Sequence, residues 1–286
     1  MGVLMTMLKQ EKNQKQNQTD KPIYLNSENY YDSETDQQYQ SPTFFKKFLA
    51  CEAEAMAEIN GEYKPDFKKA LLVGNYLHSF FESPEAHQKF IDENKEDLLS
   101  KRKPHGLLKE YKDADKMIDT LKDDDGFKQL YQGDKEVIVT GQIDDVDWKG
   151  KVDCLNLDRG YFIDLKTTQD ILKEYWNSEE RIKESFVAKW NYQLQMYVYQ
   201  ELIHQTFGVW CEPYIVAVSK QDVPDKAIIS IPNERLTEAE LLIEREQPHI
   251  EDVRHGIVEP ERCERCEYCR MTKKLGTIVS MDDLIQ

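Results

Sequence analysis

The chain has 286 residues, of which 40% are hydrophobic and 32% charged, so it is long enough for one large domain or two small ones with a buried core. Its formal net charge of −16 argues against a general nucleic-acid binder. Contact with DNA would need metal ions and local basic patches such as residues 101–112. The sequence has no apolar run of the 18 or so residues that a membrane helix needs, and its N-terminus lacks the order of a signal peptide. We therefore expect a cytoplasmic protein without a membrane partner, whose six cysteines are reduced or metal-bound.

The first half of the chain is expected to be helical. Residues 1–40 are polar, and we expect them to be partly disordered, extended or looped. A capping Ser41 and the helical spacing of apolar residues predict one helix over 41–61. A strongly apolar helix over 67–83 follows. The charged stretch at 84–130 has helical patterning and no strand signal, so we interpret it as a helical insertion.

The second half of the chain is expected to carry the sheet. Short β-branched runs broken by Gly and Asp predict three strands joined by hairpins over 136–168. A helix over 190–208, a strand over 213–220 and a late helix over 236–256 follow. This order predicts an α/β fold with a central mixed sheet flanked by helices. We expect residues 41–286 to form one domain around that sheet.

The segment 159–170, RGYFIDLKTTQD, places an aspartate and a lysine on one face of an otherwise apolar strand. Side chains alternate across a strand, so Asp164 and Lys166 point to the same side. If residues 159–160 form a two-residue hairpin loop, counting back places Asp153 opposite Lys166 on that same face. We expect a four-residue loop to keep this pairing, whereas a three-residue loop without a bulge would move Asp153 to the other face.

Two carboxylates on adjacent strands form a natural site for a hard cation such as Mg²⁺. A lysine beside the ion can orient or deprotonate a water, or stabilise developing negative charge. That combination is suited to phosphodiester hydrolysis. The alternative is a simple cross-strand salt bridge, because an Asp-x-Lys pattern is common by itself.

The surrounding motifs favour the catalytic interpretation. The arrangement D-(10 residues)-D-x-K resembles the active-site hairpin of the PD-(D/E)XK nuclease superfamily. Gly74 and His78 are similar to the G-x-x-x-H helix of its RecB-like branch, in which the histidine is a metal ligand. Gln193 and Tyr197, i and i+4 on a helix, resemble the Q-x-x-x-Y motif, which contacts DNA or the active site. The resemblance covers roughly residues 41–270.

The resemblance implies a restriction-endonuclease-like core and a Mg²⁺- or Mn²⁺-dependent deoxyribonuclease, similar to phage-type exonucleases related to exodeoxyribonuclease VIII and lambda exonuclease. It implies two overlapping sets of site residues: catalytic Asp153, Asp164, Lys166, Gln193 and Tyr197, and metal-binding His78, Asp153, Asp164 and the carbonyl of Leu165. Asp144 and Asp145 are rival candidates for the first aspartate. We prefer Asp153 because its hairpin spacing to Asp164 is short.

The resemblance further implies an exonuclease that resects double-stranded ends for a single-strand annealing recombinase. One alternative is a nuclease of CRISPR adaptation or of a helicase–nuclease complex. Another is a DNA-binding scaffold on an inactive nuclease fold, against which the intact carboxylates and lysine argue. Formation of a homo-oligomer remains open.

Three closely spaced cysteines near the C-terminus, Cys263, Cys266 and Cys269, indicate a metal centre in a reducing compartment. The sequence offers four candidates for the fourth ligand: Cys51, Cys154, Cys211 and His255. The resemblance points to Cys51, because iron–sulfur members of the RecB-like branch pair one early cysteine with three late ones. We therefore expect a 4Fe–4S cluster, with Zn²⁺ as the alternative. Cys154 should point away from the site as a small core residue.

Overall fold

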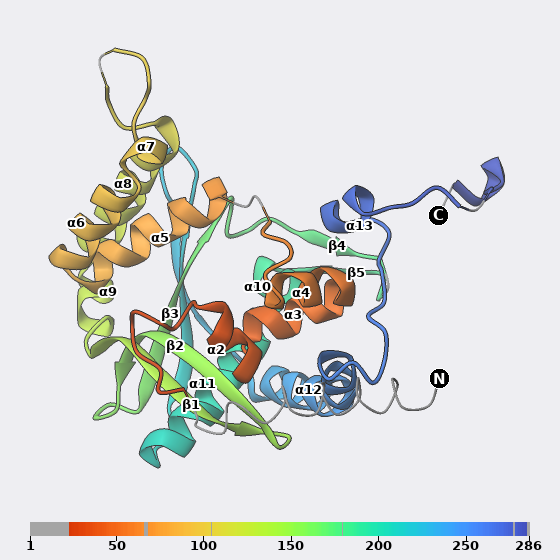
Figure 1. Cartoon of the computed structure of the whole chain (residues 1–286). Coiled ribbons are helices and arrows are strands. Elements are labelled where there is room, and N and C mark those ends of the chain that lie inside the picture. The colour runs from red at the N-terminus through yellow and green to blue at the C-terminus, as the bar shows by residue number, and fades with distance from the viewer. Residues whose placement is uncertain (1–22, 66–67, 104, 179, 277, 285–286) are drawn as a thin grey trace.

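A five-stranded mixed sheet forms the centre of the computed structural model, which describes residues 23–65, 68–103, 105–178, 180–276 and 278–284 (Figure 1). The strands lie in the order β1-β2-β3-β6-β7, with the bounds β1 Asp134–Ile143, β2 Val146–Asn156, β3 Tyr161–Thr168, β6 Glu212–Ser219 and β7 Lys226–Ser230. β3 lies in the middle and runs parallel to β6, whereas all other neighbours are antiparallel. The predicted central mixed sheet flanked by helices is confirmed.

Helices cover both faces of this sheet (Figure 1). The helices on the first face are α3 Pro42–Ala50, α4 Glu52–Ile59, α11 Tyr192–Phe207 and α12 Asn233–Arg254. The helices on the second face are α5 Lys68–Glu82, α6 Pro84–Glu93, α7 Lys95–Leu98, α8 Lys109–Lys122 and α9 Asp125–Leu130. The smaller elements are α2 Ser33–Gln38, β4 Tyr175–Asn177, β5 Ile182–Glu184, α10 Phe186–Lys189, α13 Glu267–Met271 and the 3₁₀ turn Met281–Leu284. Sequence patterns missed α2, β4, β5 and β7.

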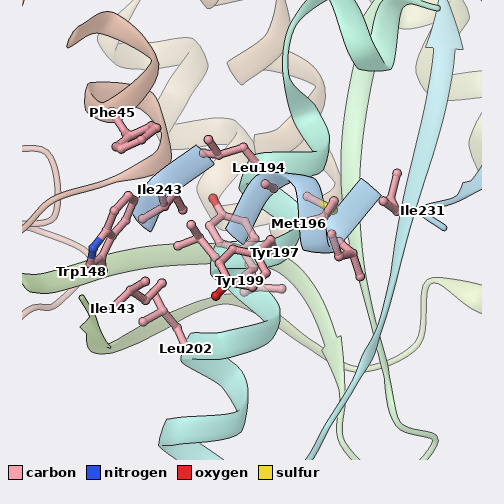
Figure 2. Close-up of a cluster of buried hydrophobic side chains, with 14 of the residues drawn as sticks. Phe45, Ile143, Trp148, Leu194, Met196, Tyr197, Tyr199, Leu202, Ile231 and Ile243 are labelled. Atoms are coloured by element: carbon pink, nitrogen blue, oxygen red, sulfur yellow. The ribbon is translucent and has the colours of Figure 1, made fainter. Parts of the chain in front are cut away.

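The alternation of side chains along β3 divides its residues between two hydrophobic clusters. Phe162 joins the cluster between the sheet and α11, part of which Figure 2 shows around Trp148. Ile163 and Leu165 join the cluster beneath α5 and α8. Asp164 and Lys166 therefore share the face of Phe162, as the strand periodicity predicts.

The hairpin between β2 and β3 has a four-residue loop, because Asn156 pairs with Tyr161. Gly160 in this loop has φ +66°, a left-handed conformation that favours glycine. The ladder ends at the pair Cys154 and Ile163. Continuing this register by one step puts Asp153 across from Asp164 rather than from Lys166. The predicted partner is therefore wrong by two positions, but Asp153 keeps the predicted face because a shift of two preserves side-chain direction.

The rival aspartates lie at a hairpin tip. Ile143 pairs with Val146, so Asp144 and Asp145 form the two-residue turn between β1 and β2. Their φ values of 51° and 60° are those that tight hairpin turns require, and aspartate tolerates them well. Both side chains are exposed. Turn formation accounts for both residues, and neither reaches Asp164.

The single helix expected over 41–61 is two helices. Ser41 caps α3 by accepting a hydrogen bond from the amide of Phe44, as its sequence position suggested. At Cys51 the backbone becomes extended, with φ −167° and ψ 106°, and α4 starts one residue later. Apolar periodicity does not reveal this break, because both helices bury residues against the same cluster.

The segment before α3 is irregular over 23–32, as expected, but it packs on β2 and contains a short helix that the sequence did not predict. Residues 1–22 lie outside the described part of the chain, but 33–38 form α2. Lys149 on β2 is only 1% exposed, and its Nζ lies 2.7 Å from Asp36 Oδ1 and donates to the carbonyl of Tyr30. This buried cation fixes residues 30–36 on the sheet. None of the helices in the described residues is long and apolar enough to cross a membrane.

Candidate active site and cysteine cluster

Asp153 stands where the β2–β3 ladder ends, and neighbours from two elements, α5 and β3, contact its carboxylate while a third holds its backbone. One oxygen, Oδ1, lies 3.2 Å from Nδ1 of His78 on α5. The other oxygen accepts a 2.6 Å hydrogen bond from the amide of Leu165. The hydroxyl of Tyr131 donates to the Asp153 carbonyl at 3.2 Å. His78 and Asp153, predicted from separate motifs, are thus brought together.

Asp164 is 1% exposed, and two side chains hold its carboxylate. Its Oδ2 forms an ion pair with Nζ of Lys166. Its Oδ1 accepts a 2.8 Å hydrogen bond from Nε2 of Gln195, which also donates to the hydroxyl of Tyr199 at 2.9 Å. Asp164 and Lys166 therefore meet as the sequence predicts, and a glutamine from α11 completes the group.

The charges of this group perturb one another strongly. Burial raises the pKa of Asp164, with the Asp153 charge adding to the effect and Lys166 opposing it. At Asp153 burial acts in the same direction, but the charge and hydrogen bond of His78 outweigh it and lower the pKa. Burial disfavours the Lys166 cation, yet the two carboxylates raise its pKa above the usual value. Lys166 is therefore an ammonium group between two aspartates.

Sequence reasoning missed Glu136. Its neighbours Lys135 and Val137 pair with Cys154 and Val152, so Glu136 stands directly across from Asp153 although the ladder skips it. Its φ of 54° is unusual for a glutamate within a strand, and such strain commonly accumulates at functional sites. Nζ of Lys151 lies 2.6 Å from its carboxylate. The sequence does place an acidic residue, Glu136, in the strand before β2. Only the pairing register of β1 and β2, which the sequence does not reveal, shows that it faces Asp153.

Glu136 completes a possible metal site. His78, Glu136 and Asp153 each offer one ligand atom, and these three atoms lie within 4.8 Å of one another. Carboxylate oxygens suit Mg²⁺ and Mn²⁺, and imidazole accepts the softer ions of the first transition row. The side chains present therefore fit a divalent cation. The predicted ligand role of the Leu165 carbonyl stays a prediction, since the observed contact of Leu165 is through its amide.

The Q-x-x-x-Y motif that faces this site is two residues further along than expected. Gln195 and Tyr199 match the same pattern as Gln193 and Tyr197, but two residues correspond to about 200° of rotation around a helix. Tyr197 is buried in the hydrophobic cluster of Figure 2. The side-chain oxygen of Gln193 is buried without a hydrogen-bond partner among the described residues. The structure therefore brings Gln195, rather than the predicted Gln193, into contact with Asp164, and Tyr199, rather than Tyr197, into contact with that glutamine.

A glycine on β2 permits this arrangement. A Cβ on Gly150 would lie 2.8 Å from ring atoms of Tyr199, closer than real Cβ atoms come. The bare backbone lets α11 approach the sheet until Gln195 reaches Asp164.

The cysteine cluster lies where the N-terminal ends of α4 and α13 meet. Cys51 Sγ is 3.5 Å from Cys269 Sγ and 3.7 Å from Cys266 Sγ, and Cys263 Sγ is 4.0 Å from Cys269 Sγ. Amides of Arg265 and Cys266 donate to Cys263 and lower the pKa of its thiol to about 6. The four cysteines predicted to share a site are together. The other candidates differ: Cys154 and Cys211 are buried elsewhere in the core, and His255 is exposed beside Glu251.

The sulfur separations bear on which metal fits. Four thiolates at about 2.3 Å from one zinc ion stand about 3.8 Å apart at the corners of a tetrahedron. The three separations given above, 3.5–4.0 Å, are close to that edge length. In a 4Fe–4S cluster each thiolate binds a different iron, so the sulfurs stand further apart. Three of the six sulfur pairs thus have the spacing of a tetrahedral zinc site, the alternative to the expected 4Fe–4S cluster.

Comparison with known proteins gives the chain a family. The family described as "PDDEXK-like domain of unknown function (DUF3799)" matches residues 41–272. A crystal structure from Eubacterium rectale, described as a "Putative exonuclease", is 33% identical, with 92% of this chain and 99% of that chain covered and a TM-score of 0.87. A second alignment, with the crystal structure of SSO0001, covers 72% of this chain and 95% of that chain at 14% sequence identity. Its TM-score of 0.29 is too low to show a common fold. No curated protein matches the sequence. The chain belongs to this PDDEXK-like family of unknown function, within the PD-(D/E)XK nuclease superfamily.

Proposed function

We propose that the chain is a divalent-metal-dependent deoxyribonuclease that digests linear DNA from its ends. The observation that carries this proposal is the convergence of Asp153, Asp164 and Lys166 with His78 at the point where β2 and β3 separate. The family match and the similarity to a protein described as an exonuclease support it.

In this proposal His78, Glu136 and Asp153 hold Mg²⁺ or Mn²⁺, with Asp164 and the Leu165 carbonyl completing the site. The ion supplies Lewis-acid stabilisation of the phosphate and activation of the attacking water. Lys166 serves as a cation that stabilises charge developing on the phosphate, because its Nζ is held beside the Asp164 carboxylate at the edge of the site. Gln195 and Tyr199 act as positioning residues, since Gln195 donates to Asp164 and Tyr199 accepts from Gln195.

Basic side chains far from the sheet offer a contact for the duplex. The loop between α7 and α8 extends away from the body of the molecule (Figure 1). Lys101, Arg102 and Lys103 on this loop are exposed. Such cations attract the DNA backbone without reading its sequence. A partner that anneals the resulting single strands, as for phage-type recombination, belongs to the same proposal.

The test is digestion of end-labelled linear duplex DNA in Mg²⁺ or Mn²⁺, comparing the wild-type protein with Lys166→Met. Lys116→Met is a matched control, because Lys116 is an exposed lysine on α8 whose ion pair among the described residues is with Asp113. We expect Lys166→Met to lose on the order of 10³-fold or more in rate, and Lys116→Met to match the wild type. Nicking of closed circles would favour an endonuclease. DNA binding without any cleavage in either metal would favour the inactive scaffold and refute the proposal.

A further inference from the structure

A row of cations and aromatic rings leads away from the active site at Lys166. Nζ of Lys166 lies 4.8 Å from the ring centroid of Tyr192, the first residue of α11. Nζ of Lys46 on α3 lies 5.2 Å from the same centroid. The Tyr192 ring thus has one cation from the catalytic strand and one from α3. Phe186 supports this ring, at 6.2 Å between centroids.

The row continues outward to the β4–β5 hairpin. Lys46 Nζ donates to the carbonyl of Trp190 at 3.3 Å. The Trp190 ring meets Tyr175 on β4 edge to face, with centroids 6.4 Å apart. Lys173 Nζ stands 5.1 Å from the Tyr175 ring. From Lys166 to Lys173, cation–ring and ring–ring contacts therefore follow one another, joined between Lys46 and Trp190 through the Trp190 backbone carbonyl.

Two features show that this path is not simply core packing. Trp190 is 53% exposed, although it is one of the largest apolar side chains available to the core. Lys46 and Lys173 form no ion pair within the described part of the chain, in contrast to Lys183, which pairs with Glu174.

We propose that an unpaired DNA strand reaches the active site along this path, with a base stacked on Trp190 and its phosphates near Lys46 and Lys173. This inference rests on the proposed nuclease function. A groove that binds single strands combines cations for the backbone with aromatic faces for the bases. A duplex cannot use such rings, because its bases are already stacked on one another. The occupant is therefore a single strand, such as a frayed or resected end.

The hairpin itself offers a matched control. Successive residues on a strand point to opposite faces, so Trp176 points away from Tyr175 and from the path. Trp176 is 61% exposed and stands across from Lys183. It has the same side chain as Trp190, is likewise more than half exposed and lies in the same region, but it is off the path.

The experiment measures fluorescence anisotropy of a labelled oligo-dT and of a labelled blunt duplex, with all variants made on an Asp164→Asn background so that nothing is cleaved. We expect Trp190→Ala to raise the Kd for oligo-dT by about 5- to 150-fold, as the loss of one stacked base does. Trp176→Ala should change it less than twofold, and Trp190→Phe should restore most of the binding. The duplex Kd should hardly change. Lys46→Met should reduce the salt slope of oligo-dT binding by about 0.7, the value of one phosphate contact on a single strand.

Several results would overturn the inference. One is a Kd of Trp190→Ala for oligo-dT within twofold of that of the Asp164→Asn background. Another is an equal loss of oligo-dT affinity for Trp190→Ala and Trp176→Ala. A third is an equal loss of duplex affinity for Trp190→Ala, which would make the occupant a duplex. Thermal melting checks that each variant is folded, and Trp190→Phe keeps the test valid if the alanine variant is not. The proposed function is tested separately by wild-type cleavage. A protein that cleaves DNA but binds oligo-dT independently of Trp190 loses only this inference, and one that binds through Trp190 but never cleaves loses only the nuclease assignment.

Discussion

Replacing Gln195 by methionine should reduce cleavage sharply without changing the fold. Methionine keeps the volume of the side chain but cannot donate the 2.8 Å hydrogen bond to Asp164 or the 2.9 Å bond to Tyr199. A hydrogen bond to a charged group contributes about 1.5–3 kcal/mol, and here its loss leaves a buried carboxylate oxygen without a partner. If the lost hydrogen-bond energy raises the activation free energy by the same amount, kcat/KM should fall about 10- to 150-fold.

Gln193→Met is the matched control on the same helix. The Gln193 side chain makes no hydrogen bond through its buried oxygen within the described residues, so its replacement should leave kcat/KM within about twofold. The assay is steady-state release of labelled nucleotides from linear duplex DNA over a range of Mg²⁺ concentrations, with circular dichroism melts of both variants. Because Gln195 acts by orienting Asp164, we expect a weaker apparent Mg²⁺ affinity for Gln195→Met. Equal losses for the two variants, or a larger loss for Gln193→Met, would refute the assignment of the motif to Gln195 and Tyr199.

Three further predictions concern metal binding. Asp153→Asn should abolish metal-dependent cleavage, whereas Asp144→Asn should retain most of it, because only Asp153 contacts His78; the reverse order in the same nuclease assay would contradict the register described here. Glu136→Gln should weaken the binding of Mn²⁺, measured by titration calorimetry, and an unchanged Mn²⁺ affinity would remove Glu136 from the site. Cys51→Ser should release the metal of the cysteine cluster and lower the melting temperature before it lowers activity. Elemental analysis of the wild-type protein should find one zinc per chain, and a brown protein containing four irons would contradict the tetrahedral geometry.

Local patterns predicted which side chains of β3 share a face, because this depends only on the alternation of side chains along a strand. The common face of Asp164 and Lys166 follows from a period of two, and the helical position of His78 follows from a motif within one element. The exact partner of Asp153 did not follow, since it depends on the length of the loop before Tyr161. An even change in loop length preserves the face but alters the partner.

Other features could not be found without the register of whole elements. The sequence YQLQMYVYQ contains the same motif twice, and only the packing of α11 on Gly150 shows which copy faces the sheet. Glu136 lies far from the D-x-K strand in sequence and enters the site through a break in the β1–β2 ladder. The break between α3 and α4 at Cys51 likewise does not show in the apolar periodicity. The extended backbone there interrupts the helix at the residue that was expected to join the late cysteines.

The position of the four cysteines in the chain also determines when, during synthesis, their cluster can form. Cys51 is separated from Cys269 by 218 residues, so at 5–20 residues per second it leaves the ribosome roughly 10 to 40 s before its last partner. Every residue of the active-site sheet is made within that interval. The strands that carry Asp153 and Asp164 can therefore pair while the junction of α3 and α4 still has a lone thiol, open to oxidation. The cluster can therefore close only after the whole sheet has been made, and only if the Cys51 thiol is still reduced at that time.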